Sequence, residues 1–363
     1  MSWECKKLGD IIEIKKGTYI TKKESKEGPY PVILGGQEPA YYIDTFNHTG
    51  KAIVVSRSGA SAGYVSFWNE PIFVTDGFLI EPKNNINVDF LYYLVKSHQA
   101  ELQGKQGGAA IPHVNPRIIN AIQVMVPNIE LQERIVDILS AYDDLIENNQ
   151  KQIKLLEEAA QRLYKEWFVD LRFPGYENTP ITDGVPQGWK QESIDNVYSI
   201  KYGKNLPTTE ISTNGKYPVY GANGVIGYYD KYNCDAYVTL VTSRGNGSGD
   251  VSRTHHSNSF VTNNSFVVIP QQAYDFISNE FTYWLMKHTD FKSICTGSAQ
   301  PQLTNNSIST LKVLVPTKKL ILHFCETTRT YFENVESLLK QNRLLTEARD
   351  RLLPKLMSGE LEV

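Results

Sequence analysis

Two arginines beside glycine-rich stretches are the side chains in this sequence best placed by type to bind a ligand. Arg57 follows the apolar run 52–55, and Arg244 opens the glycine-rich stretch 244–249. A guanidinium offers several N–H donors to a phosphate or to the edge of a base, and neighbouring glycines let such a group approach the backbone closely. This pattern predicts recognition rather than bond-making chemistry.

The sequence lacks the residue patterns of common catalytic and cofactor sites. The glycines of 243–249 do not have the spacing GxGxxG, and neither a P-loop nor the motifs of an amino-methyltransferase or a PD…(D/E)xK nuclease occur. His255 and His256 are adjacent, so in a strand they would point to opposite faces and could not share a metal ion. The four cysteines form no CxxC pair, and we expect free thiols. We therefore predict no catalytic site, metal or cofactor on this chain.

Composition places the chain among ordinary globular proteins. It has 363 residues, enough for two or more domains, with 41% hydrophobic and 21% charged residues. No run approaches the ~20 apolar residues of a membrane span, and the first residues do not resemble a secretory signal. We expect a cytoplasmic protein. The net charge is −3, so any binding of phosphate must come from local patches or from a partner.

The chain is an internal repeat with an offset of about 187 residues. Tyr30-Pro31-Val32 returns as Tyr217-Pro218-Val219, and the strand-like segment 124–127 returns as 313–316. The stretch 55–57 resembles 242–244, which aligns Arg57 with Arg244. Because the matches are collinear, they indicate a duplication, in which both halves share one fold.

Each half has the same order of predicted elements. About 125 residues rich in Tyr, Gly and β-branched side chains come first, with short apolar runs such as 52–55 and 266–269 that read as strands. A segment almost free of Gly and Pro follows in each half, at about 130–171 and 318–357. Its length predicts a helix of about 60 Å.

The apolar residues of these two helices are spaced as in a coiled coil. In the first helix, steps of four and three connect Leu131, Ile135, Ile138, Tyr142 and Leu145. After Asn149 the next step is four where three is due, which predicts a stutter at that point. The second helix has a similar seam that begins at Ile321. Helices of this length need a partner, and we predict that they pack against each other.

We predict an α+β protein. Two similar, mixed, β-rich domains are joined by two long helices, which form an antiparallel coiled coil about a pseudo-two-fold axis. The predicted segments are a first domain at 1–128, a first helix at 129–172, a linker at 173–188, a second domain at 189–316, and a second helix with a tail at 317–363.

Two similar domains on a rigid spacer suit a target with two parts. Duplex DNA presents successive major-groove faces about 34–36 Å apart, and paired half-site readers match this spacing. A helical spacer of about 60 Å is long enough to span one to two turns of the duplex.

Several stretches resemble the specificity subunit of type I restriction-modification systems. They include Gly188-Trp189, the stretch 216–228, Gly297-Ser298-Ala299-Gln300-Pro301-Gln302-Leu303, the stretch 163–170, and the tail 351–361. The resemblance covers the whole chain. The first half departs from it at 33–40, where it differs from 220–227 of the second half.

The resemblance implies a recognition subunit without chemistry of its own. Each globular half would be a target-recognition domain for one half of a bipartite site in double-stranded DNA. Two modification subunits would dock on the helices, carry S-adenosylmethionine and methylate adenine. Restriction subunits would add ATP-driven translocation and cleavage.

Base readout requires Arg or Lys for guanine and Asn or Gln for adenine, on loops that both halves share. The candidates in the first half are Lys15, Lys16, Ser56, Arg57, Ser58, Lys105, Gln106, His113 and Asn115. The candidates in the second half are Lys201, Lys204, Asn205, Asn223, Ser243, Arg244, Asn246, Gln300, Gln302 and Asn305.

Two other functions compete with DNA recognition. The chain could be a self-contained nuclease or methyltransferase, but the missing motifs argue against this. It could also be a binding module for glycans or peptides, since its 21 tyrosines and polar loops would suit such ligands. Binding to a bipartite duplex separates DNA recognition from glycan or peptide binding.

Overall fold

The computed structural model describes residues 3–36, 38–83, 85–104, 113–245, 247–297 and 301–363. The chain divides into two compact units. Unit 1 comprises Met1–Glu147 and Asn342–Val363, and unit 2 comprises Asn148–Gln341. Each unit therefore contains one globular domain and one part of each long helix.

The domain of unit 1 is built on three antiparallel or mixed sheets. Strand β1 (Glu4–Lys7) pairs with β9 (Gln123–Val126). The largest sheet has the order β2 (Ile12–Lys16), β8 (Gly77–Pro82), β5 (Ala52–Ser56) and β6 (Val65–Trp68). A smaller sheet has the order β4 (Tyr41–Ile43), β3 (Tyr30–Ile33) and β7 (Phe73–Val74).

Strand β5 forms the centre of this domain because both of its faces are apolar. Ile53 and Val55 pack into one core with Phe90 and Leu94 of α2 (Val88–Ser97). Ala52 and Val54 on the opposite face pack into a second core towards β3 and β7. The remaining short helices of this domain are α1 (Leu8–Ile11), α3 (Gln99–Gly104) and α4 (Pro116–Asn120).

Unit 2 repeats the three sheets of unit 1 and most of its helices. Its paired strands β12 (Lys190–Ser193) and β20 (Lys312–Val315) correspond to β1 and β9. Its four-stranded sheet has the order β13 (Tyr198–Tyr202), β19 (Ser265–Pro270), β16 (Thr239–Thr242) and β17 (Val251–Arg253). Its three-stranded sheet has the order β15 (Gly224–Tyr229), β14 (Tyr217–Gly221) and β18 (Phe260–Val261). The helices are α6 (Ile194–Val197), α7 (Asn279–Lys287) and α8 (Asn305–Ile308), and the hairpin β10 (Ile181–Thr182) and β11 (Val185–Pro186) precedes them.

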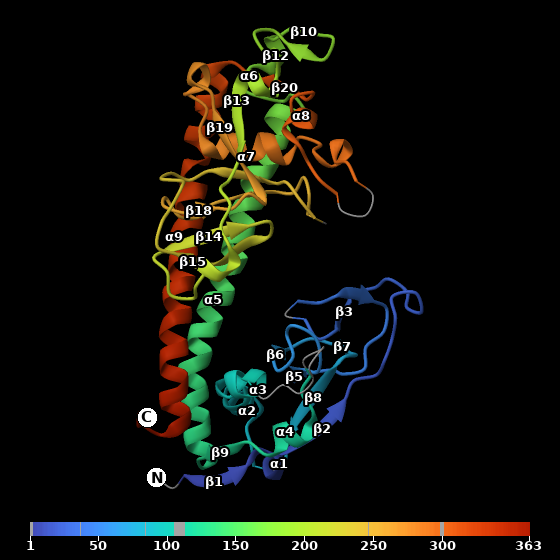
Figure 1. Ribbon diagram of the computed structural model, residues 1–363, viewed down its shortest axis with the longest axis vertical. Helices are drawn as coiled ribbons and strands as arrows, with labels where there is room; N and C mark the ends of the chain where they lie inside the picture. The colour runs from blue at the N-terminus through green and yellow to red at the C-terminus, as the bar shows by residue number, and fades with distance from the viewer. Residues whose placement is uncertain (1–2, 37, 84, 105–112, 246, 298–300) are drawn as a thin grey trace. The chain divides into compact units, whose positions relative to one another are not determined.

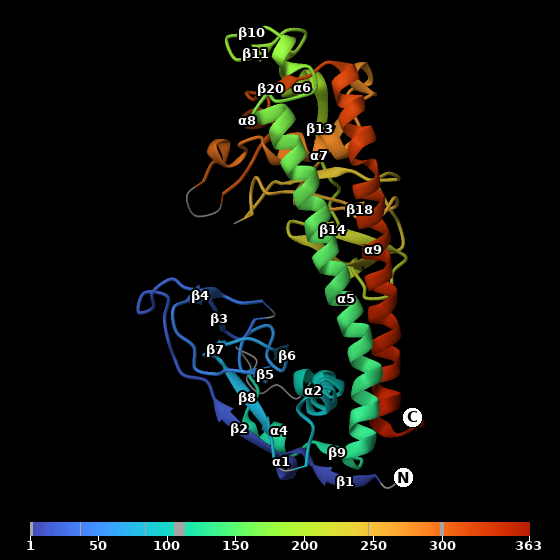
Figure 2. The ribbon, with the colours of Figure 1, turned by 180° about the vertical axis from the view of Figure 1, so that it is seen from behind.

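The two long helices are α5 (Ile129–Tyr164), which continues into a π-helical turn at Lys165–Val169, and α9 (Lys318–Ser358). In each unit they lie side by side and run in opposite directions (Figure 1 and Figure 2). In unit 1, Asp143 of α5 pairs with Arg349 of α9, and Ile146 accepts a hydrogen bond from Asn342. In unit 2, the rings of Tyr164 and Trp167 pack against Phe324 of α9. The predicted α+β fold with an antiparallel helix pair is confirmed.

The predicted seam residues of α9 are buried or half-buried, whereas the predicted seam of α5 is wrong at Leu145. This side chain is 51% exposed, and the half-buried Ile146 takes its place beside Asn342. The repeated step of four falls at Leu131, Ile135 and Leu139, all of which are buried. The stutter therefore lies nearer the start of α5 than the predicted position after Asn149, and the steps of three and four alternate from Leu139 onward.

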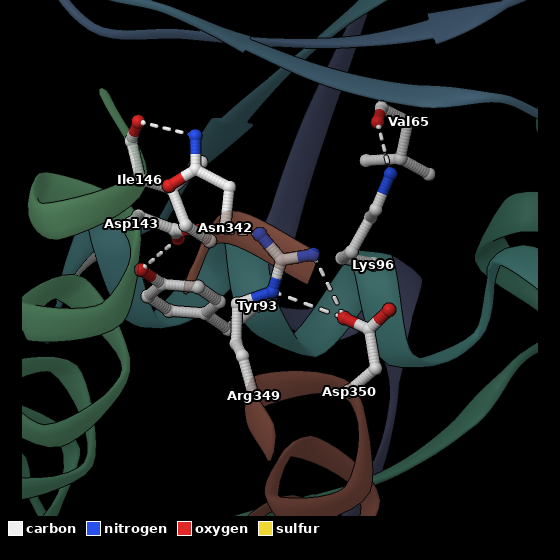
Figure 3. A network of polar contacts seen from close by, with 8 residues as sticks. All are labelled: Val65, Tyr93, Lys96, Asp143, Ile146, Asn342, Arg349 and Asp350. Carbon is white, nitrogen blue, oxygen red and sulfur yellow. Dashed lines mark hydrogen bonds and ion pairs between the residues drawn. The ribbon is translucent and has the colours of Figure 1, made fainter. Parts of the chain in front are cut away.

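A polar network connects the helix pair of unit 1 to its domain (Figure 3). The Tyr93 hydroxyl on α2 donates a hydrogen bond of 2.6 Å to Asp143 Oδ2. Arg349 Nη1 lies 2.5 Å from the other oxygen of the same carboxylate. Burial and the hydrogen bond to Asp143 both raise the pKa of Tyr93, so its hydroxyl stays protonated. One carboxylate thus bonds to α2 and α9 at once and fixes the domain on its helices.

Candidate functional site

The candidate site of unit 1 lies where β5 ends and the chain turns away from the sheet. The turn requires glycine at two positions. Gly59 and Gly63 have φ of +83° and +84°, a region that other residues rarely adopt. A Cβ at Gly63 would also lie 2.9 Å from the backbone of Gln103. The hydrogen bond from Gly63 N to Ser56 O closes the turn and presents Arg57 and Ser58 beside the strand end.

Asp76 fixes the polar side chains of this turn. Arg57 Nε lies 2.5 Å from Asp76 Oδ1, and the Ser58 hydroxyl donates to Asp76 Oδ2. The Arg57 side chain remains 39% exposed, so its outer N–H groups can still reach a ligand. The carboxylate thus orients the guanidinium and also cancels part of its charge. Asp76 was not among the residues predicted from the sequence, although the segment 74–76 resembles 261–263 of the second half.

A pocket of about 490 Å³ opens next to Arg57 and Ser58. Its apolar walls are Ile14, Phe78 and Val114, with Lys16 and His113 among its polar lining residues. His113 reaches the pocket because it forms a β-bridge with Ser58, and Val114 N donates to Arg57 O. Five of the nine residues predicted in the first half line this pocket: Lys16, Arg57, Ser58, His113 and Asn115.

The corresponding turn of unit 2 shows that Arg57 and Arg244 do not hold the same position. Leu303 N donates to Ser243 O as Val114 N donates to Arg57 O, and Arg244 bridges Gln302 as Ser58 bridges His113. Ser243 is therefore the counterpart of Arg57, and Arg244 is the counterpart of Ser58. The alignment of the two arginines in the sequence is wrong by one residue, because the loops between the strands differ in length.

This shift gives Arg244 surroundings unlike those of Arg57. Ser243 N donates to Asn264 O where Arg57 N donates to Asp76 O, so an amide residue replaces the carboxylate. Arg244 is exposed and has no ion pair with any residue that the structure describes. Its full charge is available to a ligand.

Two of the predicted serines are buried. Ser56 is the last residue of β5, and Ser243 donates its hydroxyl to Asn263 O. Ser56 lies in β5 and Ser243 directly follows β16, and both side chains are covered by the surrounding chain. A ligand at the surface therefore cannot contact these two side chains.

The other predicted residues lie in several places. Lys15 points to the opposite face of β2 from Lys16 and pairs with Glu81 at 2.6 Å. Asn115 caps α4 through its Oδ1. Gln302 lies beside Arg244 through its bridge, and Asn305 begins α8. Asn223 lies in the β14–β15 turn with Oδ1 beside Gly247. Lys201, Lys204 and Asn205 are exposed on or just after β13. Lys105, Gln106, Asn246 and Gln300 lie outside the described residues.

In the described part of the chain, the potential metal ligands are dispersed. No three His, Cys, Asp or Glu side chains there lie close enough to hold a metal ion. None of the helices in the described ranges is long and apolar enough to cross a membrane. His255 pairs with Glu336, and His256 lies 3.1 Å from the Tyr220 hydroxyl, so the two histidines have different partners.

Comparisons with known proteins agree on one family. The model of the type I restriction modification DNA specificity domain matches residues 1–158 and 186–334. The specificity subunit of the type I restriction enzyme MjaIX of Methanocaldococcus jannaschii is 26% identical, over 99% of this chain and 94% of that protein. The specificity subunit of the type I restriction enzyme HindI of Haemophilus influenzae is 23% identical, over 79% of this chain and 80% of that protein.

A solved structure shares the fold. The crystal structure of a type I restriction-modification S subunit from M. genitalium aligns with a TM-score of 0.57 at 20% identity. The alignment covers 98% of this chain and 96% of that chain.

Proposed function

The chain belongs to the family of type I restriction modification DNA specificity domains, and from this we propose that it is the sequence-reading subunit of a type I restriction-modification complex. The observation that carries the proposal is the pair of loop clusters around Arg57 and Arg244. Each cluster follows the same strand of a duplicated domain and presents a guanidinium beside glycine-rich backbone. Arginine on a loop of this kind suits bidentate contacts to guanine or to phosphate.

The differences between the two clusters support readout of two unlike half-sites. In unit 1 the guanidinium is held by Asp76, whereas Arg244 of unit 2 is exposed and has no acidic partner among the described residues. A duplicated domain with different side chains at its reading position is suited to a bipartite, asymmetric target in double-stranded DNA.

The helices supply both a spacer and docking surfaces for two modification subunits. Leu155 and Leu344 are equivalent positions of the repeat, and they are 64% and 51% exposed. Lys151 and Lys340 precede them at the same spacing. Exposed leucines on a helix that is already paired offer apolar area to a further helix. Two equivalent surfaces would bind two copies of one partner.

The chemistry of the complex would lie on these partners. The modification subunits would bind S-adenosylmethionine and methylate adenine, and the restriction subunits would use ATP for translocation and cleavage. The present chain would contribute recognition and assembly, with no cofactor of its own. It would work in the cytoplasm, where the DNA is.

Two measurements test this function. The chain is mixed with the proposed modification subunits, and binding to duplexes is followed by gel shift. Methylated adenines are then mapped genome-wide in cells that carry the chain and in cells that lack it. We expect one bipartite motif that is methylated only when the chain is present. Binding to glycans or peptides without any DNA preference, or cleavage or methyl transfer by the purified chain alone, would contradict the proposal.

A further inference from the structure

The two recognition domains differ at one aromatic ring, which is 36% exposed in unit 2. Tyr202 at the end of β13 lies directly opposite Phe266 in the sheet, with the ring centroids 4.2 Å apart. Its hydroxyl donates to Leu303 O at 3.4 Å. Unit 2 thus places a planar ring with a polar end between an aromatic face and a backbone carbonyl.

Unit 1 has the same surroundings without the ring. Lys16 lies opposite Phe78 as Tyr202 lies opposite Phe266, and Val114 corresponds to Leu303. The pocket of about 490 Å³ lies among these three residues. No residue that the structure describes donates a hydrogen bond to Val114 O. The polar and aromatic partners of the tyrosine are therefore present in unit 1, and the tyrosine is not.

The walls of this pocket select the kind of group that it can hold. Ile14, Phe78 and Val114 are apolar, so a phosphate would use only the cationic side chains Lys16 and Arg57 and would leave these walls uncovered. Lys16 and His113 offer polar atoms, which an aliphatic group could not use. A flat ring with hydrogen-bonding groups on its edge can use both the apolar walls and the polar atoms. The volume of the pocket is within the usual range of about 300–1,000 Å³ for small-ligand sites.

We propose that this pocket of unit 1 binds an unstacked, amino-bearing base of the target DNA, which occupies the position that Tyr202 fills in unit 2. The proposal rests on the proposed function and adds to it a base that leaves the duplex. The base stacks on Phe78, as extruded bases stack on aromatic and apolar side chains. Its amino group donates to Val114 O, and Lys16 Nζ donates to a ring nitrogen or carbonyl oxygen.

The inference predicts an asymmetric complex. Unit 1 extrudes a base from its half-site, whereas the Tyr202 ring closes the corresponding place in unit 2. The half-site of unit 1 therefore contains one position at which the base is recognised outside the helix, and the half-site of unit 2 is read with its bases stacked in that place.

The test uses the assembled complex with modification subunits and its mapped target. 2-Aminopurine or pyrrolocytosine replaces one base at a time through both half-sites, and fluorescence reports unstacking. We expect a signal at one position in the half-site of unit 1 that Lys16→Tyr abolishes, because the new ring fills the pocket. This variant should also bind the target about 10- to 100-fold more weakly, as expected for the loss of one base contact.

The control Lys6→Tyr makes the same exchange on β1, where Lys6 pairs with Glu4 and lines no wall of this pocket. It should keep the signal. A second variant, Lys16→Met, removes the charge but leaves the pocket open, and it should keep the signal with weaker binding. A base that is extruded for methylation by a partner subunit would also give a signal. That signal is distinguished from the proposed one because it persists in Lys16→Tyr.

Three results would overturn the proposal. They are the absence of any signal that depends on residue 16 in a complex that binds its target, equal loss of the signal in Lys6→Tyr, and uptake of free adenosine or cytidine by the pocket without extrusion from DNA. Failure of the unmodified complex to bind any bipartite duplex would instead contradict the proposed function.

Discussion

At the residue scale, charge pairing separates two arginines that the sequence presents as equivalents. Asp76 holds Arg57 at 2.5 Å, whereas Arg244 has no ion pair within the described part of unit 2. An arginine that is already bound to a carboxylate gains less from a DNA acceptor than an unpaired one. We therefore expect Arg244 to contribute more to DNA binding by unit 2 than Arg57 contributes to DNA binding by unit 1.

We predict that Arg244→Ala weakens binding of the complex to its target about 10- to 100-fold, which corresponds to one lost base contact. Its unfolding midpoint should stay unchanged because no described residue depends on this side chain. Arg57→Ala should also destabilise the domain by about 1–3 kcal/mol, since the Asp76 carboxylate loses its charged partner and keeps only the Ser58 hydroxyl. Titration of labelled duplex measures the affinity of each variant, and thermal unfolding measures its stability. The control Lys231→Ala removes an exposed charge of unit 2. Equal binding by Arg244→Ala and the parent would assign the arginine a structural role.

We also predict a loss of stability in strong alkali. Burial, with the nearby Asp143 charge, raises the pKa of Tyr92 from 10.0 to about 12. Below pH 10 both folded and unfolded states keep this proton, so its contribution is constant. Between pH 10 and 12 only the unfolded state loses it, and the free energy of unfolding falls by about 1.4 kcal/mol per pH unit from this group. Urea titrations across this range should show a shallower fall for Tyr92→Phe. Parallel curves for parent and variant would exclude the burial of this phenol as the cause.

At the element scale, the helices combine a seam with exposed leucines. Asn149 and Thr328 are buried polar residues in the seam, and Thr328 bonds to the carbonyl of Phe324 in its own helix. Buried polar residues in a seam favour one register of the pair over alternatives. A helix pair with one register can convert its length into a fixed distance.

We therefore predict that one heptad inserted after Asn149, with a matching heptad after Gln341, lengthens the gap between the half-sites. Seven residues add about 10 Å of helix, and duplex DNA rises about 3.4 Å per base pair. The gap should grow by up to about three base pairs, with both half-sites unchanged. A whole heptad preserves the phase of the seam, and methylation mapping gives the gap directly. An active complex with an unchanged gap would show that the helices do not set the spacing.

At the scale of the whole molecule, the duplication makes each recognition domain a separate folding and reading unit. Each domain has its own sheets and its own core, and each is attached to its part of the helix pair by local contacts such as those of Asp143 in unit 1. Exchange of one domain need not disturb the other.

We expect that replacement of residues 1–127 by the matching segment of a relative changes one half of the methylated motif and leaves the other half and the gap as they were. The reason is that the loop cluster around Arg57 lies within this segment, whereas the cluster around Arg244 lies outside it. The reciprocal exchange of 189–316 is the matched control and should alter the other half. A change of both halves by one exchange would refute independent readout.

The sequence by itself determined the repeat, the α+β class and the two antiparallel helices. These features follow from periodicity, because apolar spacing of two or three to four residues specifies a strand face or a helix seam within one segment. Side-chain chemistry on loops that both halves share selected five residues that line one pocket, among them Lys16, Arg57 and His113. The placement of Leu145 in the seam was wrong because a stutter can be accommodated at more than one turn of a helix.

Only the tertiary structure decided which residues meet across segments. Arg244 aligns with Arg57 in sequence, yet hydrogen bonds from the segments at Val114 and Leu303 show that it is the counterpart of Ser58. Spacing along the chain could not reveal that Asp76 pairs with Arg57, or that Tyr202 fills a place that is open beside Lys16. Such contacts join residues that are far apart in the chain, and loops of different length shift their register. The chemistry of each reading surface therefore depends on how the strands and loops come together.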